Sequence, residues 1–430
     1  MKRESVCHDT IVTAAQHRMW LSDELAEDHA ANHIPVLYRT TDPVDIVVLE
    51  AAVKRLIERH YALRVRFFLA DDGLRQKLGA ESVTVERFDL ADSDEQRRSD
   101  LLTELVQREF DLERGPLVRV TVVRSHPHEH HVLLVFHHIC VDDWSLRIVL
   151  EELWEDYARG LEGRIAVRGP AASYRDYAAR EHNWLVSSEA SALLEDVVTE
   201  LAGFPGHLAL PGEAGKPSGG HSHGGLVEAR LTREETAALE RFSRDARCSV
   251  FTTLLALYAI VLSQITGSRR FLVVVPVANR PTAEDHDTVG LFTNTVPVGI
   301  TISRPTTLRS VVEHVRIAVF DALDRQQIPF DRFAARLAPR GRGATFGNVS
   351  FGMGEAYASE PAPGIRRTDW KGYVPVRYEL AGYVTLDGES ATVSLYYDDR
   401  TKSRRLAQEW LDRWMVLLRT GVERKDPILD

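Results

Sequence analysis

The chain has 430 residues, of which 44% are hydrophobic, and its 53 Lys and Arg against 63 Asp and Glu give a formal net charge of −10. This length and composition predict a globular protein of two or three domains and exclude a disordered or collagen-like chain. Net acidity without a long Lys/Arg stripe also argues against a nucleic-acid partner.

Cysteine content and hydropathy indicate the cellular compartment in which the protein is expected. The three cysteines (Cys7, Cys140 and Cys248) are too few for a disulfide framework, and none is paired at a zinc-ligand spacing. The basic N-terminus has no apolar run behind it, and the most apolar stretch, 250–262, is shorter than the about 20 residues that span a bilayer. We therefore expect a cytoplasmic protein with no membrane partner, either free-standing or excised from a larger protein.

The first part of the chain mixes helices and strands. Thr13 is a predicted N-cap, and apolar periodicity marks the helices and strands that follow. The helices are expected at 14–26, 42–60, 99–110 and 146–160, and the strands at 34–41, 62–70, 117–125 and 131–136. Residues 137–145 then form a strand-to-helix connection.

The second half repeats this alternation after a stretch rich in Gly and Pro. Helices are expected at 231–246, 249–267 and 404–422, and strands at 271–278 and 391–399. We predict an α/β (α+β) fold with an N-terminal lobe at 1–170, an inter-lobe linker region at 171–225 and a C-terminal lobe at 226–430.

The connection at 137–145 holds a dense polar cluster in an apolar setting, namely His137, His138, Asp142, Asp143 and Ser145. Any one of these residues has an ordinary structural explanation, as a buried histidine or as a helix cap. Together, at the point where a buried strand leads into a helix, they predict a functional site. Histidine is the side chain best suited to move a proton near neutral pH.

Two other chemistries are disfavoured. Cys140 lies within the cluster, but the members of a thiol triad come from distant segments, so a cysteine nucleophile is not expected. Four histidines surround a hairpin tip, where neighbouring side chains point to opposite faces and no carboxylate or Cys completes a tetrahedral metal site. These histidines are His126, His128, His130 and His131.

The segment HHICVDDWS, 137–145, resembles the HHxxxDG motif of the condensation domains of nonribosomal peptide synthetases, which belong to the chloramphenicol acetyltransferase-like superfamily. Other family elements follow in the expected order across nearly the whole chain. They are TAAQHRMW from Thr13, RHYALRVRF from Arg59, YRDYAAREHNW from Tyr174, PVANRPTAEDHDTVGLFTNT from Pro276 and RQQIPFDRF from Arg325.

The resemblance implies two acetyltransferase-like lobes in a V-shaped pseudo-dimer with a tunnel between them. It implies an acyltransferase that forms an amide or an ester. The donor is an acyl or peptidyl thioester on the phosphopantetheine arm of a carrier protein, and the acceptor is an amine or alcohol, small or carrier-bound. The protein itself binds no cofactor and no metal in this picture.

Residue roles follow from the same resemblance. His138 matches the histidine assigned as general base or as orienter of the amine, while His137 and Asp142 match the motif's other, structural members. Asp142 would pair with Arg64, and Ser145 would lie beside the reacting carbonyl. Asn294, in the FTNT element, would lie near the tunnel.

Asp143 stands where the family has glycine. One interpretation is that aspartate tolerates a left-handed backbone and suits a helix N-terminus. The other is electrostatic, because a second carboxylate near His138 would favour the imidazolium and weaken it as a base, although it could also hold an ammonium acceptor.

Asp143 also keeps other functions open. The X-domains that recruit cytochrome P450 enzymes depart from the motif here with a second aspartate, but they are expected to lose the histidine that this chain keeps as His138. A non-catalytic domain that recruits a cytochrome P450 is therefore the alternative function. Epimerase-type chemistry, which uses the same turn, is a third.

Overall fold

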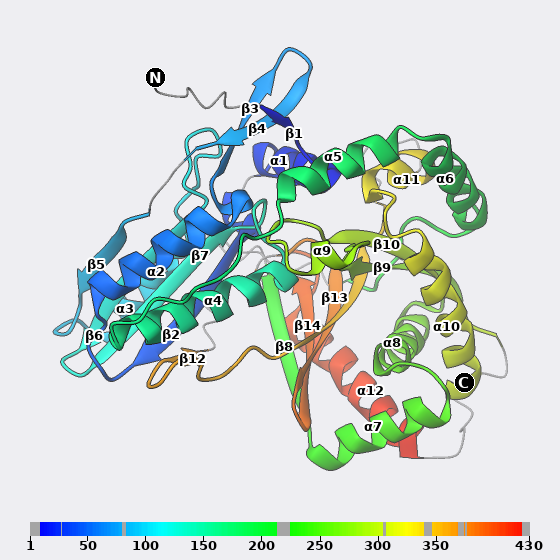
Figure 1. Ribbon diagram of the computed structural model, residues 1–430. Coiled ribbons are helices and arrows are strands. Elements are labelled where there is room, and N and C mark those ends of the chain that lie inside the picture. Colours follow the sequence, from blue (N-terminus) through cyan, green and yellow to red (C-terminus); the bar gives the residue numbers. More distant parts are fainter. Residues whose placement is uncertain are drawn as a thin grey trace. The chain divides into compact units, whose positions relative to one another are not determined.

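The computed structural model describes residues 9–26, 28–79, 83–212, 224–303, 307–338, 346–368, 374 and 376–423. The chain divides into two compact units, each built from several stretches of sequence (Figure 1). The first unit comprises Met1–Ser187, Ala278–Thr293 and Tyr357–Tyr373, and the second comprises Ser188–Val277, Asn294–Ala356 and Val374–Asp430.

This division differs from the contiguous lobes expected from the sequence. Two stretches from the second half of the chain, 278–293 and 357–373, belong to the first unit. The expected linker region also contains two helices, α5 (Tyr174–Leu185) and α6 (Ser188–Leu201), and the boundary between the units falls between them. Its Gly-rich run, 215–225, lies mostly outside the described residues.

The first unit contains two sheets and their helices. Its strands are β1 (Thr10–Ile11), β2 (His33–Thr40), β3 (Val65–Ala70), β4 (Gly73–Leu78), β5 (Val85–Asp89), β6 (Val118–His126), β7 (Glu129–His137) and β12 (Arg366–Thr368). Its helices, besides α5, are α1 (Ala14–Glu24), α2 (Ile46–Arg59), α3 (Glu95–Gln107), α4 (Asp143–Leu161) and α9 (Ala283–His286), with short 3-10 turns η1 (His29–Asn32) and η2 (Tyr61–Leu63).

Strand β7 lies at the centre of a five-stranded sheet of order β12-β2-β7-β6-β5. Successive side chains of a strand point to opposite faces. Val132, Leu134 and Phe136 pack in the cluster formed with α2 and α4, whereas Leu133 and Val135 pack against α3. Helices thus cover both faces, which explains why the strand is almost continuously apolar and confirms its predicted place inside the sheet.

Local capping sets several helix starts in this unit. The Thr13 hydroxyl accepts a hydrogen bond from the Gln16 amide and the Gln16 side chain bonds back to the Thr13 amide, so the predicted capping of α1 is confirmed. Helix α3 begins at Glu95 rather than near Ser99, because the Asp94 carboxylate accepts from the Arg97 amide and caps the helix earlier.

The second unit is a six-stranded sheet with helices. Its strand order is β10-β9-β11-β13-β14-β8. The strands are β8 (Gly224–Leu231), β9 (Arg270–Val277), β10 (Asn294–Thr301), β11 (Val349–Glu355), β13 (Leu380–Asp387) and β14 (Ser390–Asp398); the helices, besides α6, are α7 (Arg233–Asp245), α8 (Val250–Thr266), α10 (Leu308–Asp324), α11 (Phe330–Leu337) and α12 (Arg404–Glu423).

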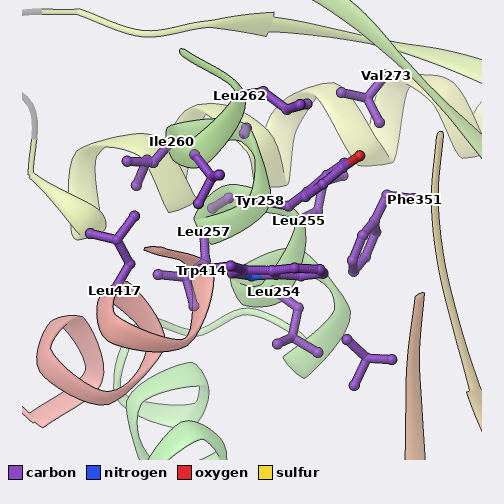
Figure 2. Close-up of a cluster of buried hydrophobic side chains, with 14 of the residues drawn as sticks. Leu254, Leu255, Leu257, Tyr258, Ile260, Leu262, Val273, Phe351, Trp414 and Leu417 are labelled. Atoms are coloured by element: carbon purple, nitrogen blue, oxygen red, sulfur yellow. The ribbon is translucent and has the colours of Figure 1, made fainter. Parts of the chain in front are cut away.

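Helix α8 lies in the core of the second unit, as its apolar sequence predicts. Its Tyr258 ring lies 5.0 Å from Trp414 of α12 and 5.7 Å from Phe351 of β11, measured between centroids (Figure 2). In the described part of the chain, no single helix is long and apolar enough to cross a membrane. Helices α7 and α8 reach that length and hydropathy only as a pair, which is bent by 101°.

Candidate functional site

The motif turn occupies the connection that the sequence predicts. Strand β7 ends at His137, and the His138 amide continues its ladder by donating to the Asn32 carbonyl at 2.8 Å. Asp142 then caps α4, accepting from the Ser145 amide at 2.8 Å. A central strand and a capped helix thus hold the polar residues of the turn from both ends.

His137 points into the interior and is 0% exposed. Its Nε2 lies 3.2 Å from Oδ1 of Asp23, and its Nδ1 accepts from the Ile139 amide at 3.1 Å. Because an amide can only donate, Nε2 carries the proton of the neutral ring. Burial alone would raise the pKa of Asp23, but the hydrogen bonds from His137 and Asn32, together with the charges of His137 and His29 when they are protonated, lower it. This arrangement fits the structural role expected for His137.

His138 is half-buried, and the proton of its ring is on the other nitrogen than in His137. Its Nδ1 lies 2.8 Å from the Val141 carbonyl oxygen, which can only accept a hydrogen bond. The proton of the neutral ring is therefore on Nδ1, and Nε2 carries the lone pair. A ring held in this tautomer by the backbone of its own turn is suited to accept a proton at Nε2.

Asp142 is completely buried and its carboxylate is saturated with donors. Oδ1 accepts from the Ser145 amide and from Arg280 Nη2 at 3.0 Å, and Oδ2 accepts from the amides of Phe292 and Thr293 at 2.9 and 3.1 Å. These bonds join the carboxylate to the start of α4 and to the stretch 278–293, and they satisfy a buried charge.

The cation that pairs with Asp142 is Arg280, not Arg64 as expected. Arg280 is also buried, and its Nη2 donates to the Ser145 hydroxyl at 2.8 Å. Arg64 instead follows η2, where its carbonyl accepts from the Gly79 amide, and its own Nε is buried without a hydrogen-bond partner. The resemblance identified the need for a buried cation correctly but assigned it to the wrong arginine.

Ser145 is bonded to the backbone of Gly290. Its hydroxyl donates to the Gly290 carbonyl at 2.7 Å and accepts from the Gly290 amide at 3.0 Å. With the bond from Arg280 as well, its only proton is committed and its side chain is 0% exposed. These bonds agree with the predicted support of the motif by Ser145, and its position beside a reacting carbonyl stays a prediction.

The stretch 278–293 is shaped to receive the turn. Asn279 has a φ of +48°, and its side-chain amide donates to the Tyr177 hydroxyl and to the Phe292 carbonyl, both at 3.2 Å. A Cβ placed on Gly290 would lie 2.0 Å from the Tyr174 ring, so only glycine fits this close approach. Both features place Arg280 and the Gly290 carbonyl against the motif.

Asp143 is the first residue of α4 and is exposed. Among the described non-glycine residues, positive φ occurs only at Arg247 and Asn279, so the left-handed interpretation of Asp143 is wrong. Its place in the first helical turn does agree with the preference of carboxylates for helix N-termini. The Tyr357 hydroxyl donates to its Oδ1.

Asn294 begins β10 in the second unit and is 4% exposed. Its Nδ2 donates to the carbonyls of Gln326 and Ile328 at 2.8 and 2.5 Å, and its Oδ1 accepts from the Phe330 amide at 3.2 Å. All these bonds fasten the RQQIPFDRF segment, so the contacts support a structural role. A position near a tunnel stays a prediction.

The structure also shows the residues of the two disfavoured chemistries. Cys140 is completely buried, and burial raises the pKa of its thiol far above the usual range, which leaves an unreactive thiol. Within the residues that the structure describes, no group of His, Cys, Asp and Glu could hold a metal ion. His126 and His130 lie on the predicted hairpin of β6 and β7.

Sequence reasoning missed four residues that build the site: Asp23, Arg280, Gly290 and Tyr357. Arg280 and Gly290 lie in an element that the resemblance already marked, so a signal was present, and a buried carboxylate requires a buried cation. Asp23 and Tyr357 carry no local signal, because their importance depends on tertiary contacts with residues 114 and 214 positions away.

Comparison with known proteins is consistent with this geometry. The condensation domain family matches residues 6–419. Malpinin synthetase of Mortierella alpina is 30% identical over 77% of this chain, and phosphinothricin tripeptide synthetase PhsB of Streptomyces viridochromogenes is 31% identical over 76%. The aligned part spans 4% and 28% of these two relatives.

Solved structures share the fold at low sequence identity. The starter condensation domain of rhizomide synthetase RzmA superposes with a TM-score of 0.84 at 18% identity, covering 98% of this chain and 96% of that one. The X-domain in complex with OxyB from teicoplanin biosynthesis gives 0.82 at 23% identity, covering 98% and 96%. The two-lobe acetyltransferase-like fold is thereby confirmed, and the chain belongs to the condensation domain family.

Proposed function

We propose that this chain is a condensation-type acyltransferase that joins a carrier-bound acyl or peptidyl thioester to an amine acceptor, or to an alcohol, in nonribosomal peptide or related natural-product biosynthesis. The observation that carries the proposal is the His138 ring, whose Nδ1 is bound to the Val141 carbonyl so that Nε2 can accept a proton. The family and the synthetase relatives support the substrate class.

In the proposed step the acceptor nitrogen attacks the thioester carbonyl carbon and forms the new C–N bond. His138 Nε2 orients the amine and takes up its proton as the tetrahedral intermediate forms. Collapse of the intermediate breaks the C–S bond, and phosphopantetheine leaves as the thiol, with the proton that His138 Nε2 took from the amine. The step balances without a metal or a redox cofactor; the carrier protein supplies the phosphopantetheine arm as part of the substrate.

The buried residues support His138 without touching the reacting atoms in this proposal. Asp142 and Arg280 neutralise each other and, with Ser145, tie the turn to Gly290. His137 holds the other end of the turn through Asp23. Such support keeps a proton acceptor within the narrow range of geometries in which transfer is fast.

The test is intact-mass detection of product from acyl-loaded carrier proteins, or pantetheine thioesters, mixed with a panel of amines and alcohols. Wild-type protein should form product, and His138→Ala should lower the rate by about 10²–10⁴-fold, because a positioned general base contributes that much. His314→Ala is the matched control, since His314 is an exposed histidine in the second unit.

A His138→Ala protein that is folded and fully active would overturn the role of His138. No product from any donor and acceptor pair, with wild-type protein that binds carrier, would overturn the transferase proposal itself. Loss of activity in His314→Ala as well would point to a general effect of histidine removal rather than to the site.

The alternative is a non-catalytic domain that recruits a cytochrome P450. It is favoured by Asp143, the second aspartate of the motif, and by the fold shared with the X-domain bound to OxyB. Such a domain should bind an oxygenase tightly in both wild type and His138→Ala. Retention of His138, with its Nδ1 bond, favours the transferase.

A further inference from the structure

Asp143 and Tyr357 meet although they are 214 residues apart in the sequence. Both belong to the first unit. The Tyr357 hydroxyl donates to Oδ1 of Asp143 and also lies 3.3 Å from its backbone carbonyl oxygen. The residue that departs from the family motif is therefore the residue that receives a long-range contact.

Two arginines flank the Tyr357 ring. The guanidinium carbon of Arg147, one turn after Asp143 on α4, lies 4.9 Å from the ring centroid, and that of Arg367 lies 4.0 Å from it. Cations over an aromatic face are attracted to it, so both arginines help to hold the ring. Burial and the neighbouring Asp143 raise the pKa of Tyr357, which keeps its hydroxyl a donor at neutral pH.

Tyr357 also begins a stretch that is fixed at its other end. The described part of that stretch ends in β12, which pairs with β2 through Arg367 and Tyr38. Strand β2 pairs in turn with β7, where His33 lies opposite His137. The stretch thus joins edge strand β12 of the sheet to the first turn of α4. The motif turn connects the same two parts, because it leads from β7 of this sheet into α4.

We propose that Asp143 is an anchor and Tyr357 a positioning residue: their hydrogen bond ties residues 357–368 to the start of α4 and so fixes the end of the turn that carries His138. A glycine at 143 has no side chain to accept this bond. The carboxylate thereby has a contact of its own within the first unit. The effect on rate rests on the proposed function, but the contact itself does not.

The first test is hydrogen exchange, followed by mass spectrometry, of the peptide that spans residues 357–368 in the full chain. Its Ile365 and Arg367 amides are bonded to the carbonyls of Ala362 and Ser359, so their exchange reports local opening. Tyr357→Phe and Asp143→Gly should each accelerate exchange about 3- to 10-fold, because each removes the same charge-assisted hydrogen bond. The double variant should exchange no faster than either single variant.

Asp143→Asn is the rescue variant, since its amide oxygen still accepts from the Tyr357 hydroxyl, and it should exchange within about twofold of wild type. Tyr396→Phe, in the second unit, is the matched control for loss of a tyrosine hydroxyl. Unchanged exchange in both single variants, or multiplied effects in the double variant, would overturn the anchor.

The second test uses the transfer reaction. Tyr357→Phe should lower kcat a few-fold with little change in KM, and should have no effect when Asp143 is already glycine. A rise in transfer on Asp143→Gly alone would overturn the positioning role and favour electrostatic suppression of His138. If wild-type protein forms no product, the proposed function fails, while the exchange experiment still decides whether the anchor exists.

Discussion

The motif turn has an inner pair of residues, His137 and Asp142, and an outer pair, His138 and Asp143. Each pair consists of one histidine and one aspartate, and the members of the two pairs are adjacent in sequence. The inner residues are both 0% exposed, whereas Asp143 is exposed and His138 is half-buried. The inner side chains bond to distant stretches through Asp23 and Arg280, while His138 bonds to its own turn.

The difference teaches that residue type alone does not decide whether a side chain of this turn is buried and bonded to a distant stretch. A buried charge must be paired and fully bonded, and such bonding fixes a side chain in one state. The outer side chains are less buried, and under the proposed function His138 is the one that meets the substrate. Experiments that treat the pairs separately should therefore give opposite results for stability and for chemistry.

The largest expected effect on stability is that of Asp142→Asn. This substitution leaves the buried Arg280 guanidinium without its counter-charge and should lower the free energy of unfolding by about 3–5 kcal/mol, measured by urea denaturation. Asp143→Asn is the control on the outer pair and should cost less than about 1 kcal/mol, because Asp143 is exposed. Equal losses would abolish the distinction between inner and outer carboxylates.

The free energy of unfolding should also depend on pH through His33, a neighbour of the inner residue His137. The centroids of the two rings lie 5.9 Å apart. Burial lowers the pKa of His33 from 6.5 to about 4. Between these values the unfolded chain binds a proton that the folded chain does not, so acidification destabilises the fold. The loss should reach up to about 3 kcal/mol by pH 4.

The measurement is urea denaturation at several pH values between 7 and 4. The fall in the free energy of unfolding between pH 7 and pH 4 should be smaller in His33→Gln by about 3 kcal/mol. It should be unchanged in the control His182→Gln, because His182 is exposed on α5. A His33→Gln protein that keeps the full wild-type decline would mean that other groups cause it.

Gly290→Ala should have a smaller effect, by steric conflict rather than by charge. The added Cβ would lie 2.0 Å from the Tyr174 ring, and the resulting shift would move the carbonyl that Ser145 binds. Overpacking of this kind costs about 1–3 kcal/mol. Gly169→Ala meets no atom within 4 Å and serves as the control in the same thermal unfolding experiment. Comparable losses in the two variants would contradict the close approach.

The smallest expected effect concerns Cys140. Its buried thiol should resist iodoacetamide at pH 8 in the folded protein, while the partly exposed Cys248 should react, as measured by peptide mass mapping. Rapid labelling of Cys140 in folded protein would contradict this prediction, because it would show that the buried part of the turn becomes exposed to solvent readily.

Much of the fold could be predicted from local pattern. Thr13 caps α1 as its sequence predicts, the helices expected at 231–246 and 249–267 are present as α7 and α8, and the apolar run of β7 predicts a strand covered on both faces. These signals depend on backbone hydrogen bonding and on periodicity, both of which are readable within about ten residues.

The composition of the two units and of the inner site could not be predicted in this way. The turn itself was located correctly, but its cation was assigned to Arg64 although Arg280 makes the pair. Strand β12 and the Tyr357 contact have no local sequence pattern. The three residues of β12 form a strand only by pairing with β2, and the Tyr357 hydroxyl is bonded only because Asp143 of α4 lies beside it. Contacts between residues more than a hundred positions apart depend on the tertiary structure, and a single sequence does not show which distant residues meet.

The distribution of the first unit over three stretches has a consequence for synthesis. Sheet β2-β7-β6 and helix α4 emerge from the ribosome before residue 170, but the arginine that neutralises Asp142 is residue 280. During translation the nascent motif turn therefore contains a carboxylate with no counter-charge for more than a hundred further residues. We expect the first unit to complete its fold late, after much of the second has been made, and a fragment that ends near residue 187 to be isolated in a partly folded state.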